Sequence, residues 1–468
     1  MNKVLLLVFL FTIGFTGCRK HSSTIEPVPV DPVTTNDLTF SEILGRPTNN
    51  SISMNVLFNG QADVYWEYGT SSGTYNLKTT TTAATKNVPL ETDFTGLTTN
   101  TKYYYRTRYR TSGSSSIYLA GPERFFHTPR PSGSTFTFAI EADPHLDTNS
   151  DTASYSLTLK NIIAKNPDFL IDLGDTFMSE KLSDHTQAGI TQRHLLMRTY
   201  FDNICHSIPL FLVIGNHEGE MGWELNGTAN SLAVMASNTR NLYYPNPSPN
   251  AYYSGNTKSE TFVGLRKNYY AFEWGDAQII VLDPYWYTVT KPGWGWTLGA
   301  DQYSWFKNAI TSSKAKYKFI FCHQIVGGNG NDARGGTEFV DFFEMGGKNL
   351  DGASAFDTYR PGWGKPIHTL MKENKATIYF HGHDHFYGKQ DKDGIVYQEV
   401  PQPSNKNITN ISATDYGYVD GTLLPGRGFL LLTVSGSSVK VEYVKTYLPI
   451  EEKSGSKNGD IGATYTIN

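Results

Sequence analysis

Five short polar blocks, each directly after an apolar run, constrain the fold of this chain more than any other feature of its sequence. The blocks are Asp143-Pro144-His145, Gly174-Asp175, Gly215-Asn216-His217-Glu218, Cys322-His323 and His381-Gly382-His383-Asp384-His385. The apolar runs have the length of buried strands, and stretches with helical spacing alternate with them. This alternation predicts an α/β layered domain, in which strand ends meet at one edge and ligand sites form there.

The same pattern places the individual elements. We expect strands at residues 135–141, 169–173, 209–214, 277–282, 317–322 and 376–380, and helices at residues 153–165, 187–205, 301–311 and 367–374. Residues 394–400, 428–434 and 439–444 also have strand patterns but no helices between them. They predict antiparallel strands added to the layered domain.

The residue types in the five blocks indicate a metal site. Carboxylate, imidazole and amide oxygen are metal ligands, and a site rich in oxygen and nitrogen favours Zn, Mn or Fe over sulfur-ligated centres. Cys322 is the one thiol in the set, and its neighbour His323 is the expected ligand. Each block alone also suits a capped turn or a core histidine. Together and in this order they predict metal binding.

The order of the blocks resembles the signature of the calcineurin-like metallophosphoesterases, the superfamily that contains the purple acid phosphatases. The resemblance covers residues 135–447 and implies a four-layer α/β/β/α sandwich with two metal ions. It implies one ion on Asp143, His145 and His385, a second ion on Asn216, His323 and His383, and Asp175 bridging both. Hydroxide between the ions would attack the phosphate ester.

The resemblance also assigns residues around the ions. His217 is expected to face the substrate, where it stabilises the transition state or protonates the leaving oxygen, without binding metal. Asp172 and Glu218 are expected to fix the orientation of imidazole ligands.

Substrate-binding residues are expected on the loops beside the metals. We expect Asn216 and His217 from the metal blocks, Arg334 on a glycine-rich loop, and Tyr387 after the last histidine block. A guanidinium can bind a phosphate oxygen with two hydrogen bonds, and a surface salt bridge is the alternative for Arg334.

Two aromatic segments flank the expected site. The long segment 219–267, rich in Asn, Pro and Tyr, has the length of a lid. Trp286, Trp294 and Trp296 either roof the site or pack beneath it.

One position departs from the purple acid phosphatases. Those enzymes carry an iron-binding tyrosine three residues after the bridging aspartate, whereas this chain has Met178 there. His145 supplies a ligand that they lack. We therefore predict a colourless enzyme with two ions of Zn, Mn or Fe, and neither the iron content nor the acid pH optimum carries over.

The first 18 residues are typical of a bacterial lipoprotein signal peptide. Lys3, the apolar run 4–13 and Gly17 before Cys18 resemble a cleavage box in which the cysteine carries lipid. An ordinary secretory signal is the alternative. Residues 19–37, rich in Pro, Thr and Ser, predict an extended linker. We expect an extracytoplasmic, lipid-anchored membrane lipoprotein, periplasmic or at the cell surface.

Residues 38–130 consist of short alternating runs separated by Gly, Ser, Asn and Thr, which predicts a seven-stranded β-sandwich. The segment resembles the fibronectin type III-like domain that precedes the catalytic domain of purple acid phosphatases. The expected organisation is therefore an all-β sandwich at 38–130, a metallophosphoesterase domain at 135–447 and a C-terminal tail at 448–468. We expect the sandwich to be structural.

Composition excludes several other classes. The net charge is −4, without the Lys- and Arg-rich runs that bind nucleic acid. Three cysteines cannot form a disulfide framework, and we expect Cys205 and Cys322 to be buried free thiols.

The sequence thus predicts a dinuclear metal-dependent phosphoesterase that hydrolyses phosphate monoesters and takes a small phosphate ester as its substrate. A phosphodiesterase acting on small diesters is the alternative within the same class. A surface binding lipoprotein with a vestigial phosphatase domain is the alternative from another class.

Overall fold

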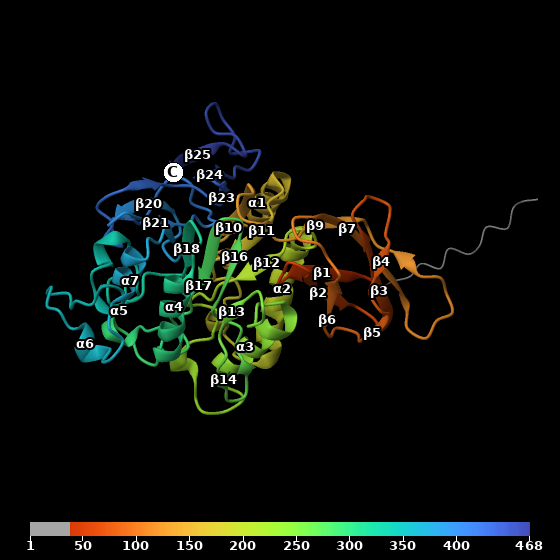
Figure 1. Ribbon diagram of the computed structural model, residues 1–468, viewed down its shortest axis with the longest axis horizontal. Coiled ribbons are helices and arrows are strands. Elements are labelled where there is room, and N and C mark those ends of the chain that lie inside the picture. Colours follow the sequence, from red (N-terminus) through yellow and green to blue (C-terminus); the bar gives the residue numbers. More distant parts are fainter. Residues whose placement is uncertain (1–37) are drawn as a thin grey trace, which may run out of the picture. The chain divides into compact units, whose positions relative to one another are not determined.

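Two large β-sheets lie face to face in the computed structural model, which describes residues 38–468 (Figure 1). The predicted signal peptide, Cys18 with its predicted lipid and the predicted linker fall outside these residues. Among the described helices, none has the length and apolar character needed to cross a membrane.

The first sheet has nine strands. Their order is β25 (Ile461–Ile467), β24 (Val439–Lys445), β23 (Gly428–Val434), β10 (Phe136–Glu141), β11 (Phe169–Asp172), β12 (Leu210–Leu212), β1 (Phe40–Gly45), β2 (Ser51–Phe58) and β6 (Leu90–Thr95). Strands β10, β11 and β12 are parallel, and β23 is antiparallel to β10. Helices α1 (Thr152–Lys165) and α2 (Gln187–Cys205) pack on its outer face through Leu159, Met197 and Phe201.

The second sheet has eight strands. Their order is β13 (Ser254–Gly255), β16 (Tyr270–Trp274), β17 (Ala277–Val281), β18 (Tyr317–Phe321), β19 (Ile378–His381), β21 (Ile395–Glu399), β20 (Tyr387–Lys392) and β22 (Thr422–Leu424). Helices α4 (Ala300–Ser312) and α7 (Ile367–Glu373) cover its outer face through Phe306, Ile310 and Leu370. The short helices α5 (Phe343–Gly346) and α6 (Phe356–Tyr359) follow β18 along the chain.

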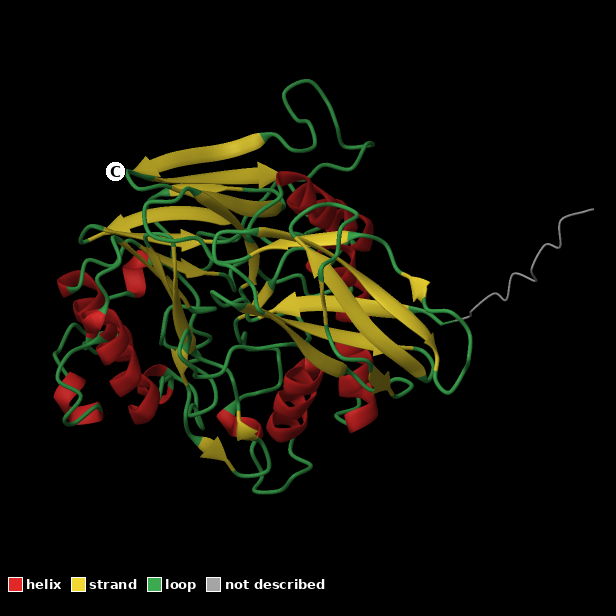
Figure 2. Cartoon of the chain, turned by 45° about the vertical axis from the view of Figure 1, so that its right-hand side comes forward, coloured by secondary structure: helices red, strands yellow, loops and turns green. Residues whose placement is uncertain are grey.

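The main core lies between the two sheets. Phe138 and Phe169 of the first sheet and Phe319 and Phe380 of the second are fully buried in one cluster. With helices outside both sheets, the layers run α/β/β/α, which confirms the predicted fold class (Figure 2). Cys205 and Cys322 are buried free thiols, as expected.

The predicted strands and helices between residues 135 and 444 are all present, with ends shifted by at most two residues. Of the three strands expected to be antiparallel, β23 and β24 are so, whereas β21 runs parallel to β19 on one side and antiparallel to β20 on the other. Within the predicted tail, β25 pairs with β24 and extends the first sheet.

The N-terminal β region forms a sandwich. Its second layer contains β3 (Ala62–Gly69), β4 (Leu77–Lys78), β5 (Thr82–Ala84), β7 (Lys102–Thr111), β8 (Leu119–Ala120) and β9 (Arg124–His127). This layer faces β1, β2 and β6 across a core that includes Trp66, Phe94, Tyr105 and Phe126. The likeness to fibronectin type III stays a prediction.

The sandwich and the layered domain share the nine-stranded sheet. Strand β1 lies parallel to β12, with Gly45 paired to Leu210. Arg198 of α2, only 1% exposed, donates to Ser41 Oγ at 2.7 Å and to the Asn55 carbonyl at 2.7 Å. Because a buried guanidinium without partners costs several kcal/mol, these bonds fix the sandwich against the layered domain.

The insertion 219–267 is not a free loop. It contains α3 (Leu232–Tyr243) and the two-residue strands β13, β14 (Ser259–Glu260) and β15 (Gly264–Leu265). Glu220 binds Arg240 at 2.5 Å and Arg266 at 2.7 Å, and Arg266 also binds Asp283 at 2.7 Å, with all four side chains buried. This network anchors the insertion to the loop after β17.

Candidate dinuclear metal centre

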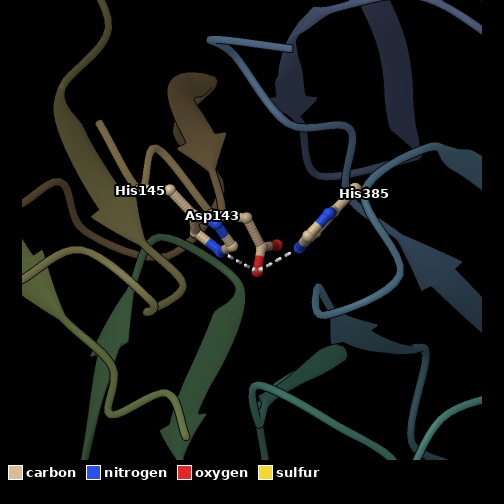
Figure 3. A group of neighbouring side chains, drawn as sticks. All are labelled: Asp143, His145 and His385. Carbon is tan, nitrogen blue, oxygen red and sulfur yellow. Dashed lines mark ion pairs between the residues drawn. The ribbon is translucent and has the colours of Figure 1, made fainter. Parts of the chain in front are cut away.

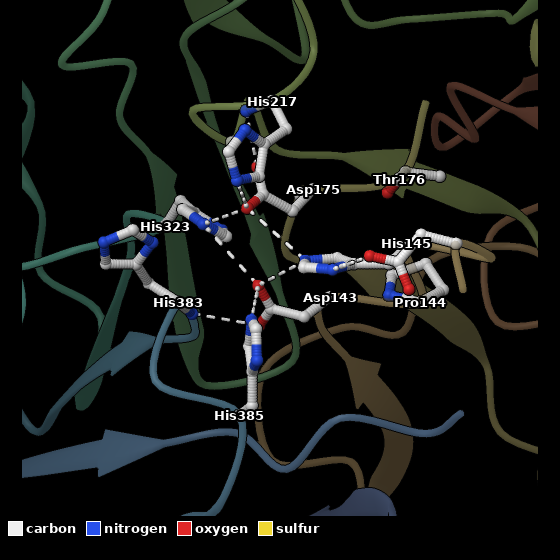
Figure 4. Close-up of polar contacts among 12 residues, drawn as sticks. Asp143, Pro144, His145, Asp175, Thr176, His217, His323, His383 and His385 are labelled. Atoms are coloured by element: carbon white, nitrogen blue, oxygen red, sulfur yellow. Dashed lines mark hydrogen bonds and ion pairs between the residues drawn. The ribbon is translucent and has the colours of Figure 1, made fainter. Parts of the chain in front are cut away.

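All the predicted metal ligands follow the carboxyl ends of parallel strands. Asp143 and His145 follow β10, Asp175 follows β11, Asn216 follows β12, His323 follows β18, and His383 and His385 follow β19. The first three strands are neighbours in one sheet and the last two are neighbours in the other. Because the two sheets face each other, their loops meet in one place (Figure 4).

The side chains fall into two groups of three. Asp143, His145 and His385 form one group, and Asp175, His323 and His383 form the other, with one ligand atom from each residue lying within 4.8 Å of the others in its group. Figure 3 shows the first group, in which Asp143 Oδ1 lies 3.6 Å from His145 Nε2 and 3.5 Å from His385 Nε2. The first group has the predicted members. The second contains the predicted His323 and His383 together with Asp175, which was expected to bridge, while the place of Asn216 in that set stays a prediction.

Asp175 lies between the two groups. Its Oδ2 is 3.2 Å from His323 Nε2 in its own group and 3.6 Å from His145 Nε2 in the other. The carboxylate is 1% exposed, so water does not compete for it. This position suits the bridging role expected for Asp175.

Buried polar atoms at the centre lack hydrogen-bond partners within residues 38–468. They are Asp143 Oδ1, His145 Nε2, Asp175 Oδ2, Asn216 Oδ1 and His323 Nε2. Each buried polar atom left unpaired costs about 1–3 kcal/mol, so five in one place point to a missing partner. All five can donate a lone pair, which is what a pair of metal ions requires. The residues therefore fit a dinuclear centre.

Two histidine tautomers are set by bonds to backbone carbonyls. His323 Nδ1 lies 2.9 Å from the Leu173 carbonyl, and His383 Nε2 lies 2.8 Å from the Asp332 carbonyl. In each ring the bonded nitrogen carries the proton, so the other nitrogen is free to bind metal. His323 thus offers Nε2 and His383 offers Nδ1.

The ligand loops have a strained backbone. The φ angles of Asp143, His145, Asp175, His383 and His385 lie between 49° and 79°, in the left-handed region. A residue other than glycine costs roughly 1–2 kcal/mol there. Such strain concentrates at functional sites, where the surrounding structure enforces it.

Buried carboxylates hold these loops through backbone amides. Glu218 accepts hydrogen bonds from the amides of Thr176 at 2.6 Å and Asp175 at 3.1 Å, and Glu399 accepts from Asp384 and His385 at 3.1 Å each. The predicted role of Glu218 in orienting an imidazole is therefore wrong, since its carboxylate orders the loop itself. Asp172 likewise accepts from the Gly174 amide at 3.0 Å.

Charges at the centre shift the pKa values of its groups. Burial alone would lower the pKa of His323, but Asp175 and Asp143 outweigh that effect and raise it to about 9. Burial would raise the pKa of Asp175, yet His323 and His217 hold it well below its usual range. Without metal, His323 therefore holds a proton near neutral pH, and a metal ion that binds this imidazole must displace that proton.

His217 has a partner that the sequence analysis missed. Its Nδ1 lies 2.9 Å from Glu180 Oε2. Its Nε2 lies 3.8 Å from Asp175 Oδ2 (Figure 4). The hydrogen bond from His217 is the main cause that lowers the pKa of Glu180. Asp147, 3.6 Å from His145 Nδ1, was missed in the same way. In the sequence, both residues could have been noticed as acidic residues that follow the first two polar blocks by a few positions.

A cavity of about 250 Å³ opens beside His217 and His383. Its walls include Asn216, Arg334, Trp223 and Trp296 as well as Lys181 and Lys291. Arg334 lines the cavity, and its Nη1 pairs with the buried Asp384 at 2.9 Å, so it forms a salt bridge while its contact with a phosphate stays a prediction.

The other predicted aromatic residues lie elsewhere. Tyr387 is 1% exposed and stacks on Tyr443, with 5.0 Å between the ring centroids, so the structure places it in the core rather than at the cavity. Trp286 packs under the Arg266 guanidinium, and Trp294 stacks on Tyr359.

Facing sheets with two candidate ligand groups at their strand ends fit a metal-dependent phosphoesterase. The family model for calcineurin-like phosphoesterase matches residues 136–387, more than half of the chain. The chain belongs to the calcineurin-like phosphoesterase family. Comparison with curated proteins gives no match.

Two solved structures share the fold over most of this chain. A purple acid phosphatase, PPD1, from yellow lupin (Lupinus luteus) seeds is 15% identical with a TM-score of 0.61, and covers 92% of this chain and 74% of its own. PhoD is 15% identical with a TM-score of 0.63, and covers 91% of this chain and 89% of its own. Both likenesses extend beyond the family-matched segment into the N-terminal sandwich.

Proposed function

We propose that this chain is a dinuclear metal-dependent phosphomonoesterase that acts on small phosphate esters. The observation that carries the proposal is the meeting of two ligand groups, with five unpartnered buried atoms, beside His217 and an open cavity. The retention of every ligand weighs against a vestigial domain that serves only for binding.

When bound, two metal ions in this centre supply an activated water and neutralise charge on the phosphoryl oxygens. Asp143, His145 and His385 would hold one ion, Asn216, His323 and His383 the other, and Asp175 both. The nitrogen-rich donor set suits Zn, Mn or Fe. Met178, in the place of an iron-binding tyrosine, supports a colourless centre.

The residues around the cavity have separate tasks. His217 Nε2 points toward the metal ligands, so it can donate a proton to the leaving oxygen while Glu180 holds Nδ1. Arg334 uses Nη1 for Asp384 and the His383 carbonyl, which leaves Nε and Nη2 for a phosphate oxygen.

The charges of the cavity favour a monoester. Lys181, Lys291 and Arg334 bring three cations to its wall, against Glu180 and Asp332. A monoester phosphoryl group is a dianion near neutral pH, whereas a diester carries a single negative charge. The doubly charged group therefore gains more from this wall.

Paired kinetics test this preference. We expect the reconstituted protein to hydrolyse p-nitrophenyl phosphate with a higher kcat/KM than bis-p-nitrophenyl phosphate. Because both esters release the same phenol, the comparison isolates the charge and size of the phosphoryl group. A diester rate tenfold above the monoester rate would establish the phosphodiesterase instead, and no hydrolysis of either ester after metal loading would favour the binding lipoprotein.

We further propose that Cys18 carries a lipid that anchors the enzyme outside the cytoplasm. Each buried methylene of an acyl chain contributes about 0.8 kcal/mol to membrane binding, so losing the chains should release the protein. Cys18→Ala is expected to move the enzyme from the membrane fraction to the soluble fraction while the phosphatase activity per molecule stays unchanged. A variant that stays in the membrane fraction would disprove this anchor.

A further inference from the structure

A wall of aromatic rings leads from the metal ligands to the cavity. Tyr285 lies 6.4 Å from the His323 ring and 6.1 Å from Trp296, measured between centroids. Trp223 stands at 88° to Trp296, with 5.7 Å between the centroids. Trp296 is 1% exposed and fixed in the core, whereas Trp223 is half-buried and lines the cavity. The rings form a rigid apolar surface next to the place where a substrate would react.

Lys291 lies over this wall. Its Nζ is 4.2 Å from the centroid of Trp223 and 5.5 Å from that of Trp296, and the residue lines the same cavity. A lysine ammonium over an indole face gains about 0.5–1 kcal/mol at an exposed site, which is less than a charged hydrogen bond can supply. The rings therefore hold the ammonium in place without satisfying its charge.

The other two cations of the cavity already have acidic partners. Arg334 pairs with Asp384 at 2.9 Å, and Lys181 lies 3.3 Å from Glu180. In the part of the chain that the structure describes, Lys291 has no carboxylate within ion-pair distance. Among these three cations it is thus the one whose charge no neighbouring carboxylate offsets.

We propose that Trp223, Trp296 and Lys291 form a leaving-group subsite that selects phosphate monoesters with a second anionic group on a planar carbon skeleton. This inference rests on the proposed phosphomonoesterase function. The metal ligands and Arg334 serve the phosphoryl group, so the half-buried Trp223, which the buried Trp296 holds in place, is left for the leaving group. The Lys291 ammonium then pairs with a carboxylate or a second phosphate at the far end of the ester.

Substrate pairs that differ only in this anion test the subsite. Lys291→Met should lower kcat/KM for para-carboxyphenyl phosphate roughly tenfold and that for phenyl phosphate less than about twofold. Because the contact with the anion exists in both the bound substrate and the transition state, the loss should fall mainly on KM. Lys291→Arg should restore most of the preference. Each substrate is compared with itself, so the difference in phenol reactivity cancels.

Lys258 supplies a matched control. Its Nζ lies 4.7 Å over the Tyr287 ring, but it pairs with Asp301 at 3.1 Å and is not among the residues that line the cavity. Lys258→Met should leave the ratio of the two kcat/KM values unchanged. Equal losses for both substrates in Lys291→Met, or an equal shift in the Lys258 variant, would overturn the subsite.

A binding measurement separates this inference from the proposed function. Benzylphosphonate and para-carboxybenzylphosphonate resist hydrolysis, and binding beside Trp223 should quench tryptophan fluorescence. We expect the metal-loaded protein to bind the carboxylated compound more tightly, and Lys291→Met to remove that difference. Hydrolysis of neither aryl phosphate would refute the phosphomonoesterase, whereas equal binding of the two phosphonates would refute the subsite.

Discussion

Replacing Asp175 with alanine is expected to remove both metal ions and lower kcat/KM by more than about 10³, since metal ions contribute several kcal/mol to the transition state. The Oδ2 atom of Asp175 lies within 3.6 Å of a histidine from each ligand group. Asp143, the other carboxylate among the ligands, lies 3.5 Å from His385 of its own group and farther, 3.7 Å, from His323 of the other. Without Asp175, the repulsion between two adjacent cations loses the carboxylate that lies closer to both groups. Metal analysis after reconstitution with Zn, Mn or Fe measures the loss.

Asp147→Ala is the control for this variant. Asp147 lies 3.6 Å from His145 Nδ1, on the side of the ring that faces away from the metal atoms. It supports a ligand but is not one, so its loss should weaken metal binding about 10- to 100-fold without emptying the site at saturating metal. Retention of two ions by Asp175→Ala would contradict the bridging assignment, whatever the activity.

The metal ligands could be predicted from sequence because their positions depend on local order. Each follows a buried strand, and parallel strands deliver their carboxyl ends to one edge. Asp143 and His383 are far apart in the chain, yet the amide of His383 donates to Asp143 Oδ2 at 2.9 Å. The apolar runs and the short polar blocks contain that information. No pattern in the sequence identifies which distant strands pair, so the pairing of β1 with β12 was not predicted.

Residues around the metals were harder to predict because their positions depend on single turns. Glu180 reaches His217 because Met178 adopts a left-handed conformation with φ of 53° and a short 3-10 turn follows. Tyr387 shows the opposite case, since β20 begins at this residue and its side chain turns into the core. No spacing rule distinguishes these outcomes in advance.

The cavity wall could not be predicted from the sequence, because its residues come together only in the complete fold. Trp223 comes from the insertion, Trp296 and Lys291 come from the segment after β17, and the buried ion pairs of Glu220 and Arg266 bring these segments together. The sequence left open whether Trp296 roofs the site or packs beneath it. It lines the cavity and is also buried, because one side of the indole packs on Tyr285.

His217→Ala is expected to keep both metal ions but lower kcat by roughly 10²–10⁴, the range for the loss of a general acid. His217 is in neither ligand group, and Glu180 rather than a metal position takes its Nδ1. A proton donor matters most when the leaving oxygen is strongly basic. The loss should therefore be greater for phenyl phosphate than for p-nitrophenyl phosphate.

Glu180→Gln separates two contributions of Glu180 to His217, the orientation of the imidazole ring and the stabilisation of its protonated form. Glutamine can still accept a hydrogen bond from Nδ1 but does not stabilise the charged ring, so we expect a smaller loss of kcat than in His217→Ala and the same trend with the leaving group. Metal content, measured beside kcat for both esters, decides between the possible roles. If His217→Ala lost its ions as Asp175→Ala should, His217 would be a ligand. If its loss were equal for both phenols, His217 would stabilise charge on the phosphoryl group rather than protonate the leaving oxygen.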